Sequence, residues 1–419
     1  MSKVLVTDAI APEGLDLLRT GAEVDVKRGL NETELIDIIK EYEALVVRSE
    51  TKVTPAVIRA GGQLKVIARA GIGVDNIDLE AATVAGIPVV NAPIGNTVAA
   101  AEHTMALMLS LARNVPQAYA SMKNGEWKRS AYMGVEVRGK VLGVVGLGRV
   151  GTEVAIRARA FGMTLVAYDP FVSPDYASRL GAQVVSLDEL LVSSDFITLH
   201  TPLTPNTNKL IGSRELSLMK PDARLINVAR GELVDEAALL EALQADKLGG
   251  VALDVFIEEP PDDMTLAQHS KVISTPHLGA STEEAQREVA IEAAGQVLAI
   301  LDGQSASNMV NAPVVRPEVQ AILANLLNLV NTREIRDIDD TVEGRTEDDP
   351  GSRPNNSEVV VNGRTGLVLD RDSSVLVPSV SGTSVTQSDI DALTDQDSAL
   401  LLIYRMRQEI FIFGQMNLC

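Results

Sequence analysis

The sequence predicts an α/β protein with two parallel sheets that follow one another along the chain. Two observations predict this fold. Short β-branched runs alternate with helical stretches from the first residues onward, and a second alternating series begins near residue 140. Such alternation is typical of parallel strands joined by helices that cover both faces of a sheet. A chain of 419 residues is long enough for two or three domains.

The first series begins almost at the N-terminus. Its strands are predicted at KVLVTD (3–8), EALVVR (43–48), LKVIARA (64–70) and PVVNAP (88–93). Between them, helices are predicted from Gly14 to Arg19 and from Pro55 to Ala60. A long helical stretch from Val98 to about Met122 would then carry the chain to the second series.

The second series contains more strands than the first. They are predicted at KVLGVVG (140–146), TLVAYD (164–169), DFITLHT (195–201), RLINVAR (224–230), GGVALDV (249–255) and VISTPH (272–277). A helix over 283–301 follows the last strand and could return the chain to the first sheet. We therefore predict a discontinuous first domain, residues 1–94 with 283–310, and a second domain over residues 95–282.

Residues 311–419 form a tail that the sequence leaves unassigned. The stretch 331–358 is polar, acidic and rich in turn formers, as is typical of a linker. Short strands are predicted within 358–370 and 373–382, and a helix or strand over 398–414. Nothing in the tail predicts chemistry.

Composition excludes several classes of function. The net charge of -20, with no dense Lys/Arg run, argues against nucleic acid and anionic membranes as partners. The single cysteine, Cys419, permits no internal disulfide, and the four histidines predict no metal site. We predict a cytoplasmic protein without a transmembrane helix, because the chain enters a strand at once and contains no apolar run of spanning length.

A glycine-rich turn carries the first functional prediction. Gly146, Gly148 and Gly151 form a G-x-G-x-x-G pattern between a predicted strand and a helix that starts near Arg149, and Asp169 ends the next strand. This context is the dinucleotide-binding fingerprint, in which the helix N-terminus binds the pyrophosphate and the acidic residue binds the ribose. The charge of Asp169 and the absence of arginine in the following PFVSPD favour NAD over NADP.

Further motifs identify a family. GLGRVG, NVARGELVDEAAL, ALDVFIEEPP and TPHLGAST resemble the D-isomer-specific 2-hydroxyacid dehydrogenase family. VVRSETKVT, RAGIGVDNIDL and NAPIGN are most similar to its members that act on phosphoglycerate, and the resemblance covers about residues 1–325. It implies a flavodoxin-like substrate domain, a Rossmann NAD-binding domain and a homodimer or homotetramer. The implied reaction is NAD-dependent oxidation of 3-phospho-D-glycerate to 3-phosphohydroxypyruvate, the first step of the phosphorylated pathway to L-serine.

The resemblance also implies catalytic residues. His277 would be the acid/base, because an imidazole can both take and give a proton near neutral pH. Glu259 would hydrogen-bond the other ring nitrogen, with the neighbouring Glu258 as its competitor. Arg230 would anchor the substrate carboxylate, since its planar fork matches a carboxylate and keeps its charge.

Binding residues follow from the same resemblance. The cofactor would be bound by Gly146, Gly148, Arg149, Val150, Gly151, Asp169, Thr201, Val228, Ala229, Arg230, Asp254, His277, Gly279 and Ala280. The substrate phosphate would be bound by Arg48, Arg69 and Arg129, the last possibly from a partner subunit, and the carboxylate end by Gly71, Ile72, Gly73 and Asn96. Relatives often carry a hydroxyl residue at the position of Ile72.

Two further histidines and three alternative functions stay open at this stage. His103 lies on an apolar helical stretch and is predicted to be a packing residue, while His200 ends a strand and would border the cofactor. The alternatives are a reductase of glyoxylate or hydroxypyruvate, a nucleotide-sensing corepressor that recruits peptides, and the altered product of a damaged gene.

Overall fold

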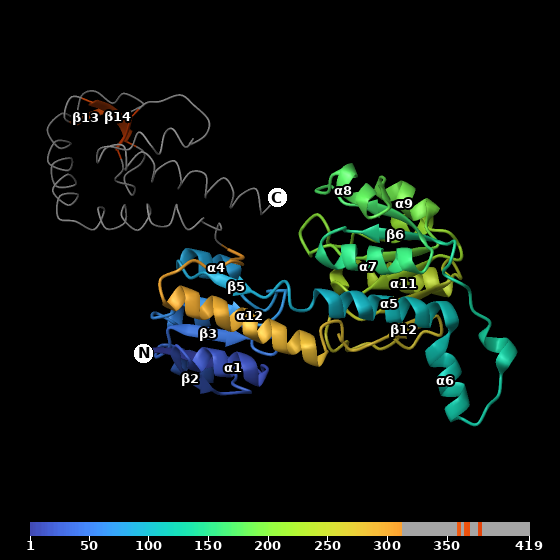
Figure 1. The fold of residues 1–419 in the computed structure, drawn as a ribbon, viewed down its shortest axis with the longest axis horizontal. Helices are drawn as coiled ribbons and strands as arrows, with labels where there is room; N and C mark the ends of the chain where they lie inside the picture. The colour runs from blue at the N-terminus through green and yellow to red at the C-terminus, as the bar shows by residue number, and fades with distance from the viewer. Residues whose placement is uncertain (312–357, 362–363, 369–375, 379–419) are drawn as a thin grey trace. The chain divides into compact units, whose positions relative to one another are not determined.

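The structure, a computed structural model, describes residues 1–311, 358–361, 364–368 and 376–378. The chain divides into two compact units, Met1–Asp302 and Gly303–Cys419. The first unit contains both predicted parallel sheets, each with its own helices (Figure 1). The predicted α/β fold class is therefore confirmed.

The N-terminal lobe is built on a five-stranded parallel sheet with strand order β2-β1-β3-β4-β5. Its strands are β1 (Ser2–Val6), β2 (Ala22–Val26), β3 (Ala44–Val47), β4 (Val66–Arg69) and β5 (Val89–Asn91), and its helices are α1 (Pro12–Arg19), α2 (Glu32–Ile39), α3 (Pro55–Ala60) and α4 (Leu79–Val84). This is the flavodoxin-like order. One face of the sheet forms a core with α2 and α3, in which Leu5, Leu45 and Ile67 are fully buried.

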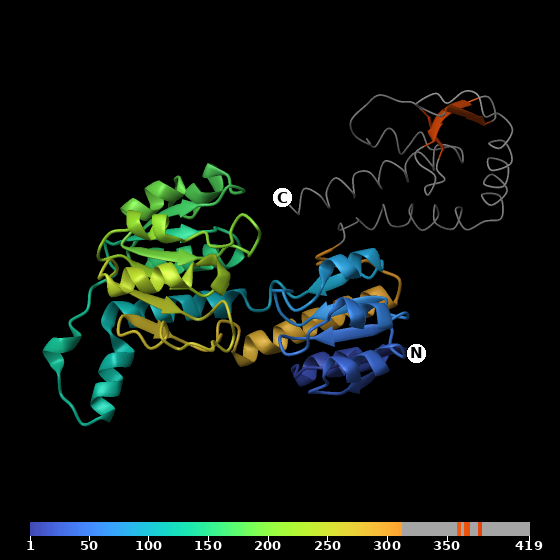
Figure 2. The same cartoon turned by 180° about the vertical axis from the view of Figure 1, so that it is seen from behind.

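The other face of this sheet is covered by α1 and by α12 (Glu283–Leu301), the helix that follows the last strand of the second sheet. Gly14 permits their close approach, because a Cβ at this position would lie 2.7 Å from the Cβ of Ala290. The helix predicted over 283–301 thus has the predicted bounds and packs on the lobe to which it was expected to return (Figure 2).

The second lobe is built on a seven-stranded parallel sheet with strand order β12-β11-β10-β9-β6-β7-β8. Its strands are β6 (Val141–Val145), β7 (Thr164–Tyr168), β8 (Ala182–Val184), β9 (Phe196–Leu199), β10 (Arg224–Asn227), β11 (Gly250–Leu253) and β12 (Val272–Ser274). Its helices are α5 (Thr97–Arg113), α6 (Val115–Lys123), η1 (Arg129–Tyr132), α7 (Arg149–Ala160), α8 (Pro174–Arg179), α9 (Leu187–Ser193), α10 (Ser213–Leu218), η2 (Gly231–Leu233) and α11 (Glu236–Gln244). The order is that of a Rossmann fold with one added edge strand, and its chain reversal lies between β6 and β9.

The single helix predicted from Val98 to Met122 is wrong in one respect, because the structure contains two helices there. α5 ends at Asn114, whose φ of 53° is left-handed, and α6 begins directly after it. Asparagine tolerates this conformation, and Pro116 then suits the first turn of a new helix, where it has no N–H to leave unpaired.

The C-terminal unit is described in part. Short strands were predicted here, and the structure contains β13 (Glu358–Val361), β14 (Arg364–Val368) and β15 (Leu376–Pro378). The three strands form an antiparallel sheet. The helix or strand predicted over 398–414 lies outside the described residues. Among the described residues, no helix combines the length and the apolar composition needed to cross a bilayer.

Candidate active site

The glycine-rich turn joins the carboxyl end of β6 to α7. Gly146 has a φ of 90°, which favours glycine, and a Cβ on Gly151 would collide with the carbonyl oxygen of Gly146. Gly148 is the N-cap of α7 and provides no side chain to cap it, and no atom lies within 4 Å of the place a Cβ would take. With the adjoining Arg149 and Val150, the turn therefore presents the helix N-terminus to open space, where an anion can approach.

Asp169 follows β7 and holds this turn in place. Its Oδ2 accepts a hydrogen bond of 2.8 Å from the backbone N–H of Leu147, and its Oδ1 accepts one of 2.9 Å from that of Phe171. Each carboxylate oxygen retains further acceptor capacity. The predicted ribose-binding residue thus lies beside the predicted pyrophosphate-binding turn.

The carboxyl ends of β9 and β10 supply the next predicted residues. The hydroxyl of Thr201 is buried and has no hydrogen-bond partner among the described residues. Desolvation lowers the pKa of the adjacent His200 to about 3, so that its imidazole is neutral at physiological pH. The Asn227 side chain donates to the carbonyl of Arg230 and accepts from the N–H of Ala229, which fixes the turn over 228–230.

Two predicted catalytic residues meet at the end of β12. The Nδ1–H of His277 donates to Oε2 of Glu259 at 2.6 Å, and half of the His277 side chain is exposed. Glu259, rather than Glu258, is thus the carboxylate beside this imidazole. Burial raises the pKa of Glu259, but the hydrogen bond and charge of His277 outweigh burial and hold it below its usual value. The ring therefore keeps Nε2 free for a substrate.

His277 has left-handed backbone geometry, with a φ of 53°. Its N–H donates to the backbone oxygen of Asp254 at 2.8 Å. The buried Asp254 carboxylate also accepts from the N–H groups of Leu278 (2.7 Å) and Gly279 (2.8 Å). The predicted cofactor residues Asp254, Gly279 and Ala280 thus belong to the turn that presents the imidazole.

Arg230, the third predicted catalytic residue, contacts the N-terminal lobe. Its Nε donates to Oδ2 of Asp75 at 3.0 Å, and its Nη1 donates to the carbonyl of Ala229 at 2.7 Å. A Cβ on Gly73 would collide with the guanidinium, so a larger residue there would require the Arg230 side chain to move. Asp75 was not predicted from the sequence, and nothing in its spacing distinguishes it from an ordinary loop carboxylate.

Arg69, at the end of β4, is repelled by the charges of two other arginines. Burial, together with the charges of Arg230 and Arg48, lowers the pKa of its guanidinium to about 10, although the charge of Asp75 acts in the opposite direction. Its Nε is buried without a hydrogen-bond partner among the described residues. Such a guanidinium remains a cation at neutral pH, and an anion would relieve both its desolvation and the repulsion.

Arg48 is held in place at the end of β3. Its backbone N–H donates to the buried carboxylate of Asp8 at 2.5 Å, and its Nη1 donates to the carbonyl of Ala9 at 3.3 Å. Burial lowers the pKa of this guanidinium too. Arg48 also lines a cavity of about 570 Å³ beside the first turns of α1 and α12.

The glycine loop after β4 and the start of α5 supply the remaining substrate predictions. A Cβ on Gly71 would collide with the Arg69 guanidinium, and the carbonyl of Ile72 accepts from the Asn91 side chain at 2.6 Å. Oδ1 of Asn96 is buried and has no partner within the described part of the chain. This orphaned amide is consistent with a bound polar ligand.

Arg129 has no contact with the other predicted site residues within the described part of the chain. It is exposed in η1, and the segment that contains it projects outward from the seven-stranded lobe (Figure 1). Within the described residues, no hydrogen bond or ion pair connects it with another predicted site residue. A contribution to this chain's own substrate site has no support from this geometry.

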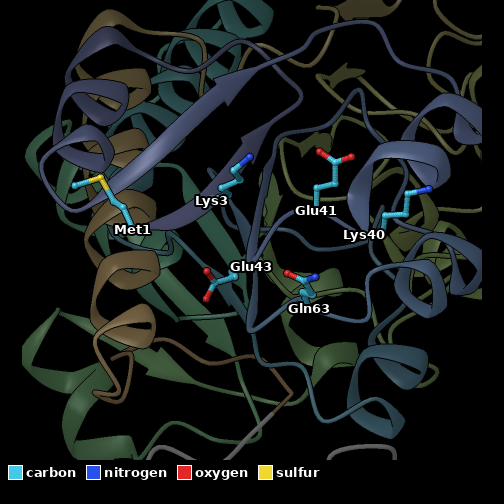
Figure 3. A pocket seen from close by; sticks show the side chains of 6 residues that line it. All are labelled: Met1, Lys3, Lys40, Glu41, Glu43 and Gln63. Carbon is cyan, nitrogen blue, oxygen red and sulfur yellow. The ribbon is translucent and has the colours of Figure 1, made fainter.

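Figure 3 shows a different hollow, of about 650 Å³, at the amino end of the five-stranded sheet. It is lined by Met1, Lys3, Lys40, Glu41, Glu43 and Gln63. Glu43 is already paired with Lys65 at 2.5 Å and accepts from Ser2. Ligands of doubly wound sheets bind at the carboxyl ends of strands, so this hollow is not the candidate site.

Sequence comparisons relate this chain to known proteins. The family described as D-isomer specific 2-hydroxyacid dehydrogenase, NAD binding domain, matches residues 105–279. A D-3-phosphoglycerate dehydrogenase from a Synechocystis species is 52% identical over 332 residues, which are 79% of this chain and 60% of that protein. The chain therefore spans about 60% of the length of the curated relatives that it matches.

Solved structures match the described lobes as well. A protein from Thermus thermophilus shares 39% identity with a TM-score of 0.68, covering 74% of this chain and 99% of its own. A D-lactate dehydrogenase from Aquifex aeolicus, solved with NAD and lactic acid, shares 31% identity with a TM-score of 0.68 and is covered over its full length.

Proposed function

Because this chain belongs to the D-isomer-specific 2-hydroxyacid dehydrogenase family, we propose that it oxidises 3-phospho-D-glycerate to 3-phosphohydroxypyruvate with NAD. This reaction is the first step of the phosphorylated pathway to L-serine. This choice of substrate is supported by one observation: the positive charges of Arg48 and Arg230 act on the guanidinium of Arg69. The names of relatives that are about half identical over three quarters of the chain point to the same substrate.

The arginines suit a small, highly charged anion. Arg230 supplies a fork for the substrate carboxylate, while Arg48 and Arg69 would share the phosphate. An unphosphorylated hydroxy acid would leave the buried Arg69, which Arg230 and Arg48 repel, without a phosphate to pair with. The site therefore favours the phosphorylated acid over glycerate or lactate.

His277 and Glu259 supply the proton chemistry. The free Nε2 of His277 accepts the C2 hydroxyl proton as hydride leaves C2, and the Glu259 carboxylate stabilises the imidazolium that results. Arg230 holds the carboxylate, so that the hydroxyl stays within reach of the imidazole. In the reverse direction, the imidazolium returns the proton to the keto oxygen.

The residues present fit NAD. The open turn at Gly148, the unpartnered hydroxyl of Thr201 and the acceptor oxygens of Asp169 are suited to its pyrophosphate and ribose groups. When bound, NAD supplies the acceptor for the hydride. The negative charge of Asp169 supports NAD rather than its 2′-phosphorylated form.

We also propose a homo-oligomer of two or four copies. Exposed apolar side chains gather on α6 and the segment that follows it: Val115, Tyr119, Met122, Trp127 and Met133. A second copy that covered them would bury apolar surface and could take up Arg129 from its partner.

A single cysteine in 419 residues supports our further proposal of a reducing, cytoplasmic location.

Substrate kinetics of Arg48→Gln and Arg69→Gln test the proposed function. Each loses a charged contact to phosphate, which is worth about 1.5–3 kcal/mol, so KM for 3-phosphoglycerate should rise about tenfold or more. KM for D-glycerate should change less than about threefold, because glycerate has no phosphate to lose. The measurement is NADH formation at varied substrate, with the exposed Arg59→Gln as a control expected to match wild type.

Two results would contradict the proposal. Equal losses for both substrates would show that the arginines do not bind phosphate. A wild-type enzyme that reduces glyoxylate or hydroxypyruvate but not the phosphorylated keto acid would establish the alternative reductase.

A further inference from the structure

His103 is a part-buried residue of an apolar helix, as predicted, and its ring also makes two hydrogen bonds. It lies in the middle of α5, and its side chain is 19% exposed. Its Nε2 is 3.1 Å from Oδ1 of Asp254 and 3.0 Å from the hydroxyl oxygen of Thr275. These partners follow β11 and β12, so a helix residue closes a polar network at the carboxyl edge of the sheet.

The same network holds the turn that carries His277. The Thr275 hydroxyl donates to Oδ1 of Asp254 at 2.5 Å, and the Asp254 carboxylate accepts the N–H groups of Leu278 and Gly279. The backbone oxygen of Asp254 accepts the N–H of His277. One buried aspartate thus holds the chain at His277 and immediately after it.

This restraint has a physical purpose. A left-handed backbone at a non-glycine residue is energetically unfavourable, and it persists only where its surroundings over-determine it. His277 has this geometry, and its N–H is held by the backbone oxygens of Asp254 and Thr275.

His103 is one of the donors that keep Asp254 in this role. Burial would raise the pKa of Asp254, but the hydrogen bond from His103, followed by that from Thr275, lowers it below its usual value. An ionised carboxylate has four lone-pair sites, which allows it to accept from side chains and backbone together. A leucine in place of His103 would fill the space without supplying the donor.

We propose that His103 is a positioning residue: by hydrogen-bonding Asp254 and Thr275, it fixes the turn that aims the imidazole of His277 at the substrate. It acts through Asp254 and does not touch the reacting atoms. Its effect on turnover rests on the proposed function, whereas its effect on the turn does not.

Two substitutions separate hydrogen bonding from packing. In His103→Gln the amide nitrogen reaches about as far as Nε2 and retains a donor, and in His103→Leu the donor is lost. We expect His103→Leu to lower kcat about 10- to 100-fold, as the loss of an orienting partner typically does, with KM changed less than about threefold. His103→Gln should stay within about threefold of wild type in both. Glu102→Gln, an exposed neighbour on α5, is the control expected to leave kcat unchanged.

Amide hydrogen exchange supplies a readout that needs no substrate. In His103→Leu, the amides of residues 277–279 should exchange at least about tenfold faster than in wild type, while His103→Gln restores protection. Unchanged exchange in His103→Leu, or equal kcat for the leucine and glutamine variants, would overturn the positioning role. Faster exchange in a protein that turns over no hydroxy acid would keep that role and reject the proposed function instead.

Discussion

At the scale of single residues, the site depends on the pairing of one imidazole with one carboxylate. Glu259 is ionised because the hydrogen bond and charge of His277 hold its pKa down in spite of burial. The carboxylate orients the ring through Nδ1 and also stabilises its protonated form. These two effects can be separated experimentally, because glutamine can still accept from Nδ1–H but has no charge.

We predict that Glu259→Gln lowers kcat for hydroxy-acid oxidation about 10- to 100-fold. Keto-acid reduction, which needs the imidazolium, should also slow, because the carboxylate charge that stabilises this cation is gone. The measurement is kcat against pH in both directions. Glu258→Gln is the matched control, and identical profiles for the two variants would show that Glu259 has no special role.

Sequence reasoning predicted these residues through their motifs and not through their geometry. Glu259 and His277 are eighteen positions apart, and only a family resemblance connects them before folding. The left-handed φ of His277, the Asp75 contact of Arg230 and the network of His103 could not be predicted. They depend on contacts between residues far apart in the chain, which the local sequence does not specify.

At the scale of elements, the buried strands were predictable and the polar edge strands were not. The central strands β3, β9 and β11 are buried throughout and consist mainly of apolar residues, which form continuous runs. β2 and β8 lie at sheet edges. The sequence of β2, AEVDV, alternates polar and apolar residues, and that of β8, AQV, is too short to be recognised as a strand. Tertiary pairing, rather than propensity, makes these segments strands.

The glycine turn gives a prediction at this scale, because its glycines have different neighbours. Gly148→Ala has space for the new methyl group and should leave the melting temperature within about 2 °C of wild type, while obstructing the pyrophosphate and weakening NADH binding about tenfold. Gly151→Ala forces α7 away from β6 and should cost about 1–3 kcal/mol of stability as well as NADH affinity. Thermal unfolding and NADH titration check both. A Gly151→Ala protein with normal melting and binding would contradict the packing argument.

At the scale of the whole molecule, a chain with a net charge of -20 would have to bind the proposed trianionic substrate through a local positive field. Two arginines of the first lobe and one of the second supply it, and motif resemblance predicted all three.

The distribution of the chain between the sheets was also predictable, because each alternating series contains its own strands. The tail was not assigned, since its composition offers neither a motif nor a sustained apolar period.

A buried arginine that is repelled by other arginines should lower the stability of the ligand-free protein. Arg69 is desolvated, has an unpartnered Nε and is repelled by Arg230. We therefore predict that Arg69→Met raises the melting temperature of the ligand-free protein by about 2 °C, equivalent to roughly 1 kcal/mol. The same variant should lose the stabilisation by 3-phosphoglycerate, which for wild type is about 2.7 kcal/mol at a concentration of 100 Kd.

Thermal unfolding with and without 3-phosphoglycerate checks both halves of this prediction. Arg59→Met, which removes an exposed arginine of α3, is the control that should melt like wild type and retain the ligand response. If Arg69→Met melted lower than wild type yet kept the full response to 3-phosphoglycerate, Arg69 would be a structural cation and the phosphate would bind elsewhere. If Arg69→Met instead melted higher than wild type and lost the response to 3-phosphoglycerate, Arg69 would lower the stability of the ligand-free protein in order to bind an anion.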